Sequence, residues 1–370
     1  TIRDVATGQG VVHFISEHDD KLVELPQRRE FSVPKGPIRL ARTPNAVFVL
    51  SLVEHAITAY RLDAKGRITG EPVRTTNDGP FWSSSTAQAT GSDLVVAGGV
   101  ENHPLDRREG FFGYVDSFVY GFRFDGARFD PVFSVNVGEH GLIVPKAIEI
   151  SKNEILVTSY GGTNALRLAR DGKVIGASFW APGTTAIAHG VAANPLLDAW
   201  VTADKIVRVA DERDRRSDRE RLGEALFFTG LMAPKSSSED AKSRFSCETC
   251  HFEGYVDGRT HHTGRGDVRA TTKPLVGLFN NRPHFSRALD PDLAAVAENE
   301  FRVAGAPSPA DPHFTLRSVD AAWLNLQTAE VDATELRRSL MEFLMTWTHR
   351  TNPMTAERKE FTPDERRGAE

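Results

Sequence analysis

The chain has 370 residues, of which 40% are hydrophobic and 26% charged, so it can form two domains of about 150 to 200 residues each. Its formal net charge of −5 offers no basic face for phosphates, which excludes nucleic acid as a partner. The sequence lacks the run of about 20 apolar residues that a transmembrane helix needs, and residues 1–5 do not have the pattern of a secretory signal.

The first part of the chain repeats one sequence pattern, which consists of two predicted strands and a turn. Residues 46–52 and 56–62 are β-branched and aromatic runs followed by an Asp-Ala-Lys-Gly turn. The same pair of predicted strands recurs at residues 93–99 and 117–124 and at residues 154–160 and 165–169. A further copy begins at residues 199–202. Repetition at roughly 40 to 60 residues predicts the blades of a β-propeller.

These repeats resemble the YVTN/YncE-like β-propellers, whose blades end in a turn of the form x-Leu/Phe-Asp-x-x-Gly. The resemblance covers about residues 30–210, and we assign residues 1–210 to a β-propeller-like domain. About four blades fit into this length, so the domain is expected to be incomplete, with the ring closed by other chain or the fragment beginning inside the domain. An open β-sandwich is the alternative fold.

A mixed-charge run at residues 211–218 predicts a linker, after which the strand pattern fades. Helical periodicity replaces it at residues 219–228 and 334–348. In the second stretch, apolar side chains at spacings of four, three and four form one helix face, made of Leu336, Leu340, Phe343 and Trp347. The second domain is therefore predicted to be mainly α.

The two cysteines of the chain lie in one short motif, Cys247-Glu248-Thr249-Cys250-His251. Two thiols are too few for a disulfide framework, a four-cysteine zinc site or an iron–sulfur cluster. Cys-x-x-Cys-His is the attachment signature of haem c: two thiols for the two vinyl groups and His251 as the iron ligand. The other ring nitrogen of His251 should then donate to a carbonyl or a carboxylate.

Two other readings of the cysteine pair remain open. A redox dithiol would require a βαβ context, which the sequence does not predict, and a zinc site would have to recruit His261 or His262 at an unusual spacing. Haem c attachment implies that the protein is exported, with the periplasm as its expected location.

The surrounding motifs resemble the bacterial di-haem cytochrome c peroxidase and MauG superfamily. Residues 221–228, 256–259 and 269–278 match the family pattern GxxLFF…CxxCH…DGR…R.TP.L.G. The resemblance covers about residues 215–370 and implies a c-type cytochrome domain at 219–360. Residues 361–370 resemble the lead-in to a second haem motif, which implies a truncated second haem domain and a second haem in the full-length protein. Ca²⁺ is common between the domains of the family, and the sequence leaves open whether it binds here.

The family resemblance also supplies candidate residues around the haem. In the family, a glutamate from a loop moves protons between the oxygens of peroxide, and Glu300 is the nearest match. The match lacks the family proline, and residues 284–287 differ from the family pattern as well. A histidine soon after the haem motif can occupy the sixth iron position, which points to His261 or His262. Other candidate sixth ligands are Met232, Met341, Met345, Met354, His284, His313 and His349.

Three functions are compatible with these features. The leading one is a periplasmic haem oxidoreductase of the peroxidase and MauG kind, whose propeller docks a redox partner protein or a small-molecule substrate. The second is a non-enzymatic electron-transfer cytochrome with a partner-binding propeller. The third is a propeller-based dehydrogenase with the cytochrome as electron acceptor, for which His103, His140 and His189 could line a pocket.

Overall fold

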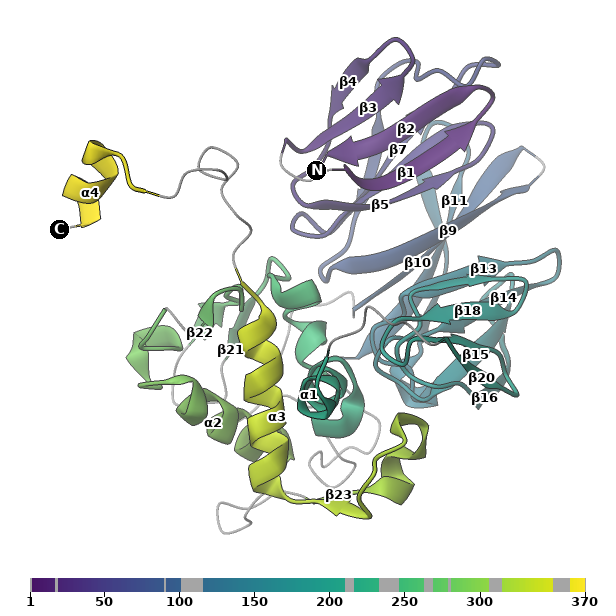
Figure 1. Ribbon diagram of the computed structural model, residues 1–370. Coiled ribbons are helices and arrows are strands. Elements are labelled where there is room, and N and C mark those ends of the chain that lie inside the picture. Colours follow the sequence, from purple (N-terminus) through teal and green to yellow (C-terminus); the bar gives the residue numbers. More distant parts are fainter. Residues whose placement is uncertain are drawn as a thin grey trace.

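The computed structural model describes residues 2–16, 19–89, 91–100, 116–209, 216–232, 246–262, 269–278, 281–305, 315–348 and 360–369. Within these residues, the N-terminal part of the chain folds into five four-stranded sheets, each an antiparallel meander in sequence order. Figure 1 shows the sheets following one another along the chain, with the helices gathered beside them. The protein is therefore built on a β-propeller of five blades in its described part.

The blades are numbered here in chain order, and their strands are short, as expected for propeller blades. Blade 1 consists of β1 (Ile2–Gly8), β2 (Val11–Ser16), β3 (Lys21–Leu25) and β4 (Arg29–Ser32). Blade 2 consists of β5 (Pro37–Arg42), β6 (Ala46–Ser51), β7 (Ala56–Arg61) and β8 (Val73–Thr76). Blade 3 consists of β9 (Phe81–Ala89), β10 (Ser92–Val100), β11 (Ser117–Phe124) and β12 (Phe129–Asn136). Blade 4 consists of β13 (Ala147–Ile150), β14 (Glu154–Thr158), β15 (Asn164–Ala169) and β16 (Val174–Phe179). Blade 5 consists of β17 (Ala186–Ala188), β18 (Val191–Asn194), β19 (Ala199–Val201) and β20 (Ile206–Arg208).

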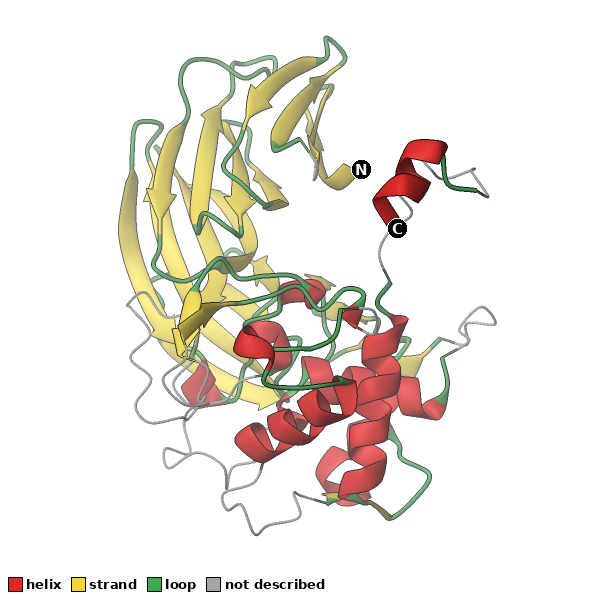
Figure 2. Ribbon diagram, turned by 90° about the vertical axis from the view of Figure 1, so that its left-hand side faces the viewer, coloured by secondary structure: helices red, strands yellow, loops and turns green. Residues whose placement is uncertain are grey.

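Consecutive blades pack through apolar faces, and their first strands adjoin one another in the order β1, β5, β9, β13, β17. Blades 1 and 2 share a core that includes Ile15 and Val49, and blades 2 and 3 share one that includes Phe48 and Phe81. Figure 2 shows the strands fanned out in an arc, with the helices packed against one side. The first strands therefore form the inner row of the arc.

The outer faces of the terminal blades retain apolar side chains. Val5 in blade 1 is 48% exposed, and Trp200 in blade 5 is 54% exposed. Trp200 lies directly opposite Val207 of the neighbouring strand, which is also exposed. These two faces are the ends of the arc.

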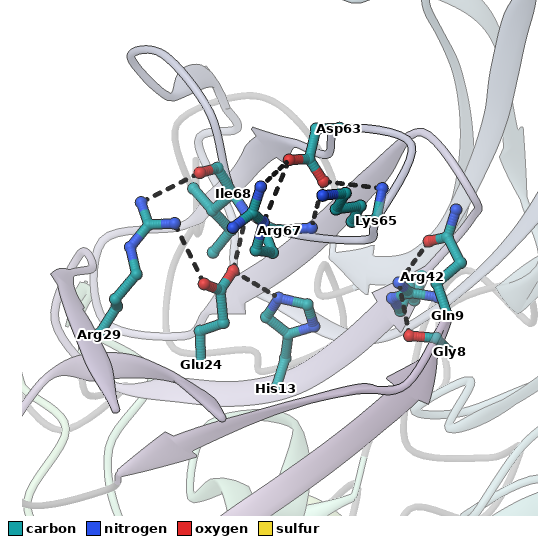
Figure 3. A network of polar contacts seen from close by, with 10 residues as sticks. All are labelled: Gly8, Gln9, His13, Glu24, Arg29, Arg42, Asp63, Lys65, Arg67 and Ile68. Atoms are coloured by element: carbon teal, nitrogen blue, oxygen red, sulfur yellow. Dashed lines mark hydrogen bonds and ion pairs between the residues drawn. The ribbon is translucent and has the colours of Figure 1, made fainter. Parts of the chain in front are cut away.

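The structure confirms the predicted strand pairs of blades 2 to 4 and the strand that begins at Ala199, and it rules out the sandwich alternative. The prediction of about four blades was wrong, because blade 1 was not recognised. Its strands β2 and β3 bury His13 and Glu24, which are both fully inaccessible to solvent. Figure 3 shows that Glu24 also accepts hydrogen bonds from Arg29 and from the backbone of Ile68 in blade 2. Buried polar residues at core positions hide the apolar alternation of a strand.

Four helices lie in the described part of the C-terminal region: α1 (Asp218–Phe228), α2 (Leu293–Gly305), α3 (Ala333–Thr346) and α4 (Pro363–Ala369). Short 3-10 turns and two two-stranded sheets, β21 (Thr260–His262) with β22 (Arg269–Thr271) and β23 (Leu316–Arg317) with β24 (Glu330–Val331), lie between them. The region is thus less helical than predicted. In the described residues no helix is long and apolar enough to cross a membrane.

The helices α1 and α3 form the core of this region, as the sequence pattern predicts. Ser217 caps α1 in a capping box with Glu220, and Asp332 caps α3 by accepting from the backbone N–H of Glu335 at 2.9 Å. Gly223 of α1 faces α3 so closely that a Cβ there would lie 2.0 Å from the carbonyl oxygen of Ser339. The glycine of the family pattern GxxLFF is therefore required by close contact between the two helices.

The face of α3 is as predicted for three of its four residues. Leu336, Leu340 and Phe343 are buried within the helix, whereas Trp347 follows it as the C-cap. The Trp347 ring stacks edge-on against Phe227 of α1, with 4.7 Å between ring centroids. Aromatic contacts therefore join the end of α3 to α1.

Candidate functional site

The Cys-x-x-Cys-His motif forms one tight turn. Residues Cys247–Thr249 are a 3-10 turn, and the N–H groups of Cys250 and His251 both donate to the carbonyl of Cys247, at 3.2 and 2.9 Å. This geometry gathers Cys247, Cys250 and His251 within one turn of chain. The two cysteines are not joined by a disulfide.

The ring of His251 is oriented from a distant part of the chain. Its Nδ1 atom lies 2.9 Å from the carbonyl oxygen of Lys273, which can only accept a hydrogen bond. Nδ1 therefore carries the proton, and Nε2 is the nitrogen with the lone pair. This is the kind of partner that a metal-binding histidine has on its second nitrogen.

Cys247 lies in apolar surroundings. It packs against the apolar cluster that includes Phe227 and Met232, and its Sγ atom is 3.9 Å from Sδ of Met232. Burial raises the pKa of the Cys247 thiol well above its usual range, and the charge of Glu300 raises it further. A redox dithiol needs the opposite shift, toward the thiolate, so the environment argues against that reading.

Glu300 lies close enough to the first cysteine to act on it electrostatically. It belongs to helix α2 and is partly buried, whereas the family resemblance predicted a loop glutamate. The structure thus brings Glu300 and Cys247 together, although they are far apart in the sequence, and corrects the secondary structure expected for the glutamate.

His261 and His262 lie in strand β21, where they pair with Ala270 and Arg269 of β22. Their side chains lie outside the described part of the structure. In the described part, no group of three or more His, Cys, Asp or Glu side chains could hold a metal ion. The zinc reading therefore gains no support from the described side chains.

The other candidate ligands have different surroundings. Met232 is buried beside Cys247, whereas Met345 is 52% exposed and Met341 packs against the helical core. His284 is buried, and its backbone pairs with that of Asp290 in an isolated antiparallel β-bridge. The remaining candidates lie outside the described residues, and they are Met354, His313 and His349.

Of the three histidines predicted to line a propeller pocket, the two in the described residues lie at opposite ends of the sheets. His140 lies between blades 3 and 4, as expected, but His189 is exposed in the β17–β18 hairpin inside blade 5, and His103 lies outside the described residues. A cavity of about 680 Å³ is present at the junction of blade 5 with α1 and α3, lined by residues such as Arg208, Arg221 and Ser339. It shares no residue with the Cys-x-x-Cys-His turn.

The turn is packed onto the propeller, which the sequence did not reveal. We call residues 246–258 the motif loop. Glu248, between the cysteines, forms a buried ion pair with Lys146, which immediately precedes β13. Phe252, next to His251, is buried in the core of blades 2 and 3. The motif loop is therefore part of the propeller core as well as of the helical region.

Further contacts extend this interface to blades 1 and 2. Arg3 of β1 pairs with Glu253, and Nε2 of His55 lies 2.7 Å from the carbonyl oxygen of Asp257. Gly258 has a φ of +75°, and a Cβ there would lie 2.6 Å from the carbonyl oxygen of Val53. The Asp-Gly-Arg motif at residues 257–259 is thus explained by its contact with the propeller.

These contacts all lie at one end of the sheets. In an antiparallel meander, the start of the first strand and the hairpin between the second and third strands lie at the same end. Arg3 and Lys146 lie at the starts of first strands, while Val53 and His55 lie in the hairpin between the second and third strands of blade 2. The motif loop therefore covers the face of the propeller formed by these ends.

Neither a protein-family model nor a curated protein matches the sequence. Similar solved structures include the hydrazine synthase of Kuenenia stuttgartiensis, with 10% identity over 50% of each chain and a TM-score of 0.33. A proposed 6-phosphogluconolactonase from Bacteroides uniformis has 11% identity, a TM-score of 0.35 and coverage of 47% of this chain and 52% of its own. The glutaminyl cyclase of Myxococcus xanthus has 13% identity, a TM-score of 0.30 and coverage of 56% and 91%. The chain thus spans about half the length of the first two proteins.

Proposed function

We propose that this chain is an exported, periplasmic c-type haem protein, with haem attached through Cys247 and Cys250 and ligated by His251. The observation that carries the proposal is the hydrogen bond from Nδ1 of His251 to the carbonyl of Lys273, within the turn that presents both thiols. It holds the imidazole with Nε2 as the ligating nitrogen. A structural histidine can make the same hydrogen bond, but it does not require two thiols in the same turn.

The surroundings of the turn fit such a group. Cys247 packs against an apolar core, and so do Leu275 and Leu278 from the segment that also supplies the Lys273 carbonyl. A thiol kept protonated by burial suits a thioether anchor better than a redox thiolate. A haem bound here would supply a redox-active iron, while these side chains would limit the access of water.

Within this proposal, an oxidoreductase of the peroxidase and MauG kind is supported better than a simple electron carrier. Glu300 is a partly buried carboxylate whose charge reaches the Cys247 thiol. A carboxylate held near the haem can accept or deliver a proton through its oxygens as peroxide reacts. An electron carrier needs no acid–base group at this position.

The proposal is tested by producing the whole chain in the periplasm of a host that matures c-type haem. We expect a pyridine haemochrome spectrum with one covalent haem per chain, a high-spin ferric band and a spectral change on adding peroxide. Cys247→Ser with Cys250→Ser should abolish covalent attachment, while His189→Gln, which replaces an exposed histidine, should not. A haem that is low-spin and inert to peroxide would contradict the oxidoreductase, and a chain without covalent haem would contradict the whole proposal.

A further inference from the structure

Lys146 is a buried cation held inside the interface between the propeller and the motif loop. Its side chain is 4% exposed, and that of its partner, Glu248, is fully buried. Its ammonium group lies 4.5 Å from the ring centroid of Tyr160 and 4.8 Å from that of Phe252, with Phe228 further away at 5.8 Å. The cation is thus enclosed by aromatic rings and paired with the Glu248 carboxylate, and its charge also lowers the pKa of Glu253.

A buried ion pair of this kind adds little to the free energy of folding. Removing two charges from water costs several kcal/mol per ion, and apolar residues of similar volume often replace such pairs without loss. Removal of one partner, by contrast, leaves an uncompensated buried charge. The pair does fix how the two segments that carry it are placed relative to each other, because the ammonium group and the carboxylate must meet at a single point.

This placement matters because of where Glu248 lies in the turn. The N–H groups of Cys250 and His251 both donate to the carbonyl of Cys247, so the two thiols and the imidazole belong to one closed turn that also contains Glu248. Glu248 contacts the propeller through Lys146, and Phe252, directly after the turn, is buried in the propeller core. Anchoring Glu248 therefore helps to determine where the two thiols and the imidazole point.

We propose that Lys146 is a positioning residue, which fixes from the propeller, through Glu248, the orientation of the turn that presents both thiols and His251. This inference rests on the proposed function in treating the turn as a haem carrier. The anchoring itself concerns only residues of this chain. In this proposal the propeller forms part of the haem site, in addition to docking a partner or substrate.

The test is amide hydrogen exchange on the whole chain, read in the turn. The N–H groups of Cys250, His251 and Gly254 are bonded within the turn and become exchangeable when it opens. In Lys146→Met these amides should exchange about tenfold faster or more than in the parent. The control is Arg219→Met, which breaks the exposed pair with Glu335 between α1 and α3 and should leave the turn unchanged.

A second variant distinguishes a loss of orientation in the turn from a general loss of stability. Lys146→Met with Glu248→Met leaves no buried charge unpaired, so its thermal midpoint should return close to that of the parent. Its turn amides should nevertheless stay fast, because two apolar side chains do not fix a direction. If the turn of this double variant is as protected as in the parent, packing alone orients the turn and the proposal is wrong.

A haemochrome count on the same samples separates this inference from the proposed function. Absence of covalent haem in the parent would reject the haem site, while the exchange rates would still decide whether Lys146 anchors the turn. Where haem is attached, the double variant should also show a reduction potential different from that of the parent. An unchanged potential together with protected turn amides would overturn the positioning role.

Discussion

The imidazole of His251 donates a hydrogen bond from Nδ1 to the backbone carbonyl of Lys273, at 2.9 Å. Lys273 is followed by Pro274, and a residue before proline is restricted to extended backbone conformations. The direction of the accepting carbonyl is therefore set by the chain itself. In the proposed haem site, this hydrogen bond would make His251 a more basic ligand than an imidazole without it.

The Lys273 carbonyl provides the first prediction. If the proposed haem is attached, Pro274→Gly should loosen the carbonyl, weaken electron donation by His251 and shift the reduction potential to a more positive value. Spectroelectrochemical titration measures the shift. Pro195→Gly, at an exposed position of blade 5, is the matched control and should leave the potential unchanged. A Pro274 variant with the parent potential would show that the hydrogen bond does not tune the ligand.

The effect of the Glu300 charge on the Cys247 thiol provides a prediction about chemistry. Glu300→Gln keeps the size of the side chain and removes its acid–base capacity, so the reaction of the proposed haem protein with peroxide should slow by about 100-fold or more. Stopped-flow absorption measures the rate. The control is Glu298→Gln on the exposed side of the same helix, which should react like the parent. Equal rates in the two variants would remove Glu300 from the mechanism.

The contact of Gly258 with blade 2 predicts a stability effect. Gly258→Ala places a Cβ 2.6 Å from the Val53 carbonyl oxygen at a φ of +75°, and it should lower the free energy of unfolding by about 1 to 3 kcal/mol. Gly126→Ala is a matched control, because its φ is +94° but nothing lies within 4 Å of the new Cβ. Urea denaturation should show a larger loss for Gly258→Ala than for Gly126→Ala. Equal losses would mean that backbone strain alone accounts for the effect.

The buried pair of His13 and Glu24 predicts how stability depends on pH. Burial lowers the pKa of His13 below its usual 6.5, and Arg42 lowers it further, although the hydrogen bond to Glu24 and the charge of Glu24 act in the opposite direction. Below pH 6.5 the unfolded chain therefore binds a proton that the folded protein does not, so stability falls as the pH falls. The loss begins near the unfolded pKa and ends at the lower folded pKa.

His13→Gln should remove this part of the pH dependence. We expect the free energy of unfolding of the parent to decrease by up to about 1 kcal/mol more than that of the variant between about pH 7.5 and pH 5.5. Urea denaturation at both pH values measures the difference. His189→Gln, which replaces an exposed histidine, should keep the slope of the parent. A slope in His13→Gln equal to that of the parent would exclude His13 as its source.

Local patterns in the sequence were sufficient wherever a structure depends on near neighbours. The strand pairs of blades 2 to 4 alternate visibly, and Leu336, Leu340 and Phe343 show the helical period of α3. The Cys-x-x-Cys-His turn is likewise closed by hydrogen bonds among adjacent residues. Blade 1 was not predicted, because the buried polar residues His13 and Glu24 interrupt the apolar pattern of its strands.

Contacts between distant parts of the chain had no such signature. The sequence by itself determined the strand pairs of blades 2 to 4, the helices α1 and α3 and the presence of the Cys-x-x-Cys-His turn. Only the tertiary structure placed Lys146 against Glu248 and the Lys273 carbonyl against His251. Side-chain periodicity reports which face of an element is buried, but not which distant residue covers it, because that depends on how the blades and helices pack together.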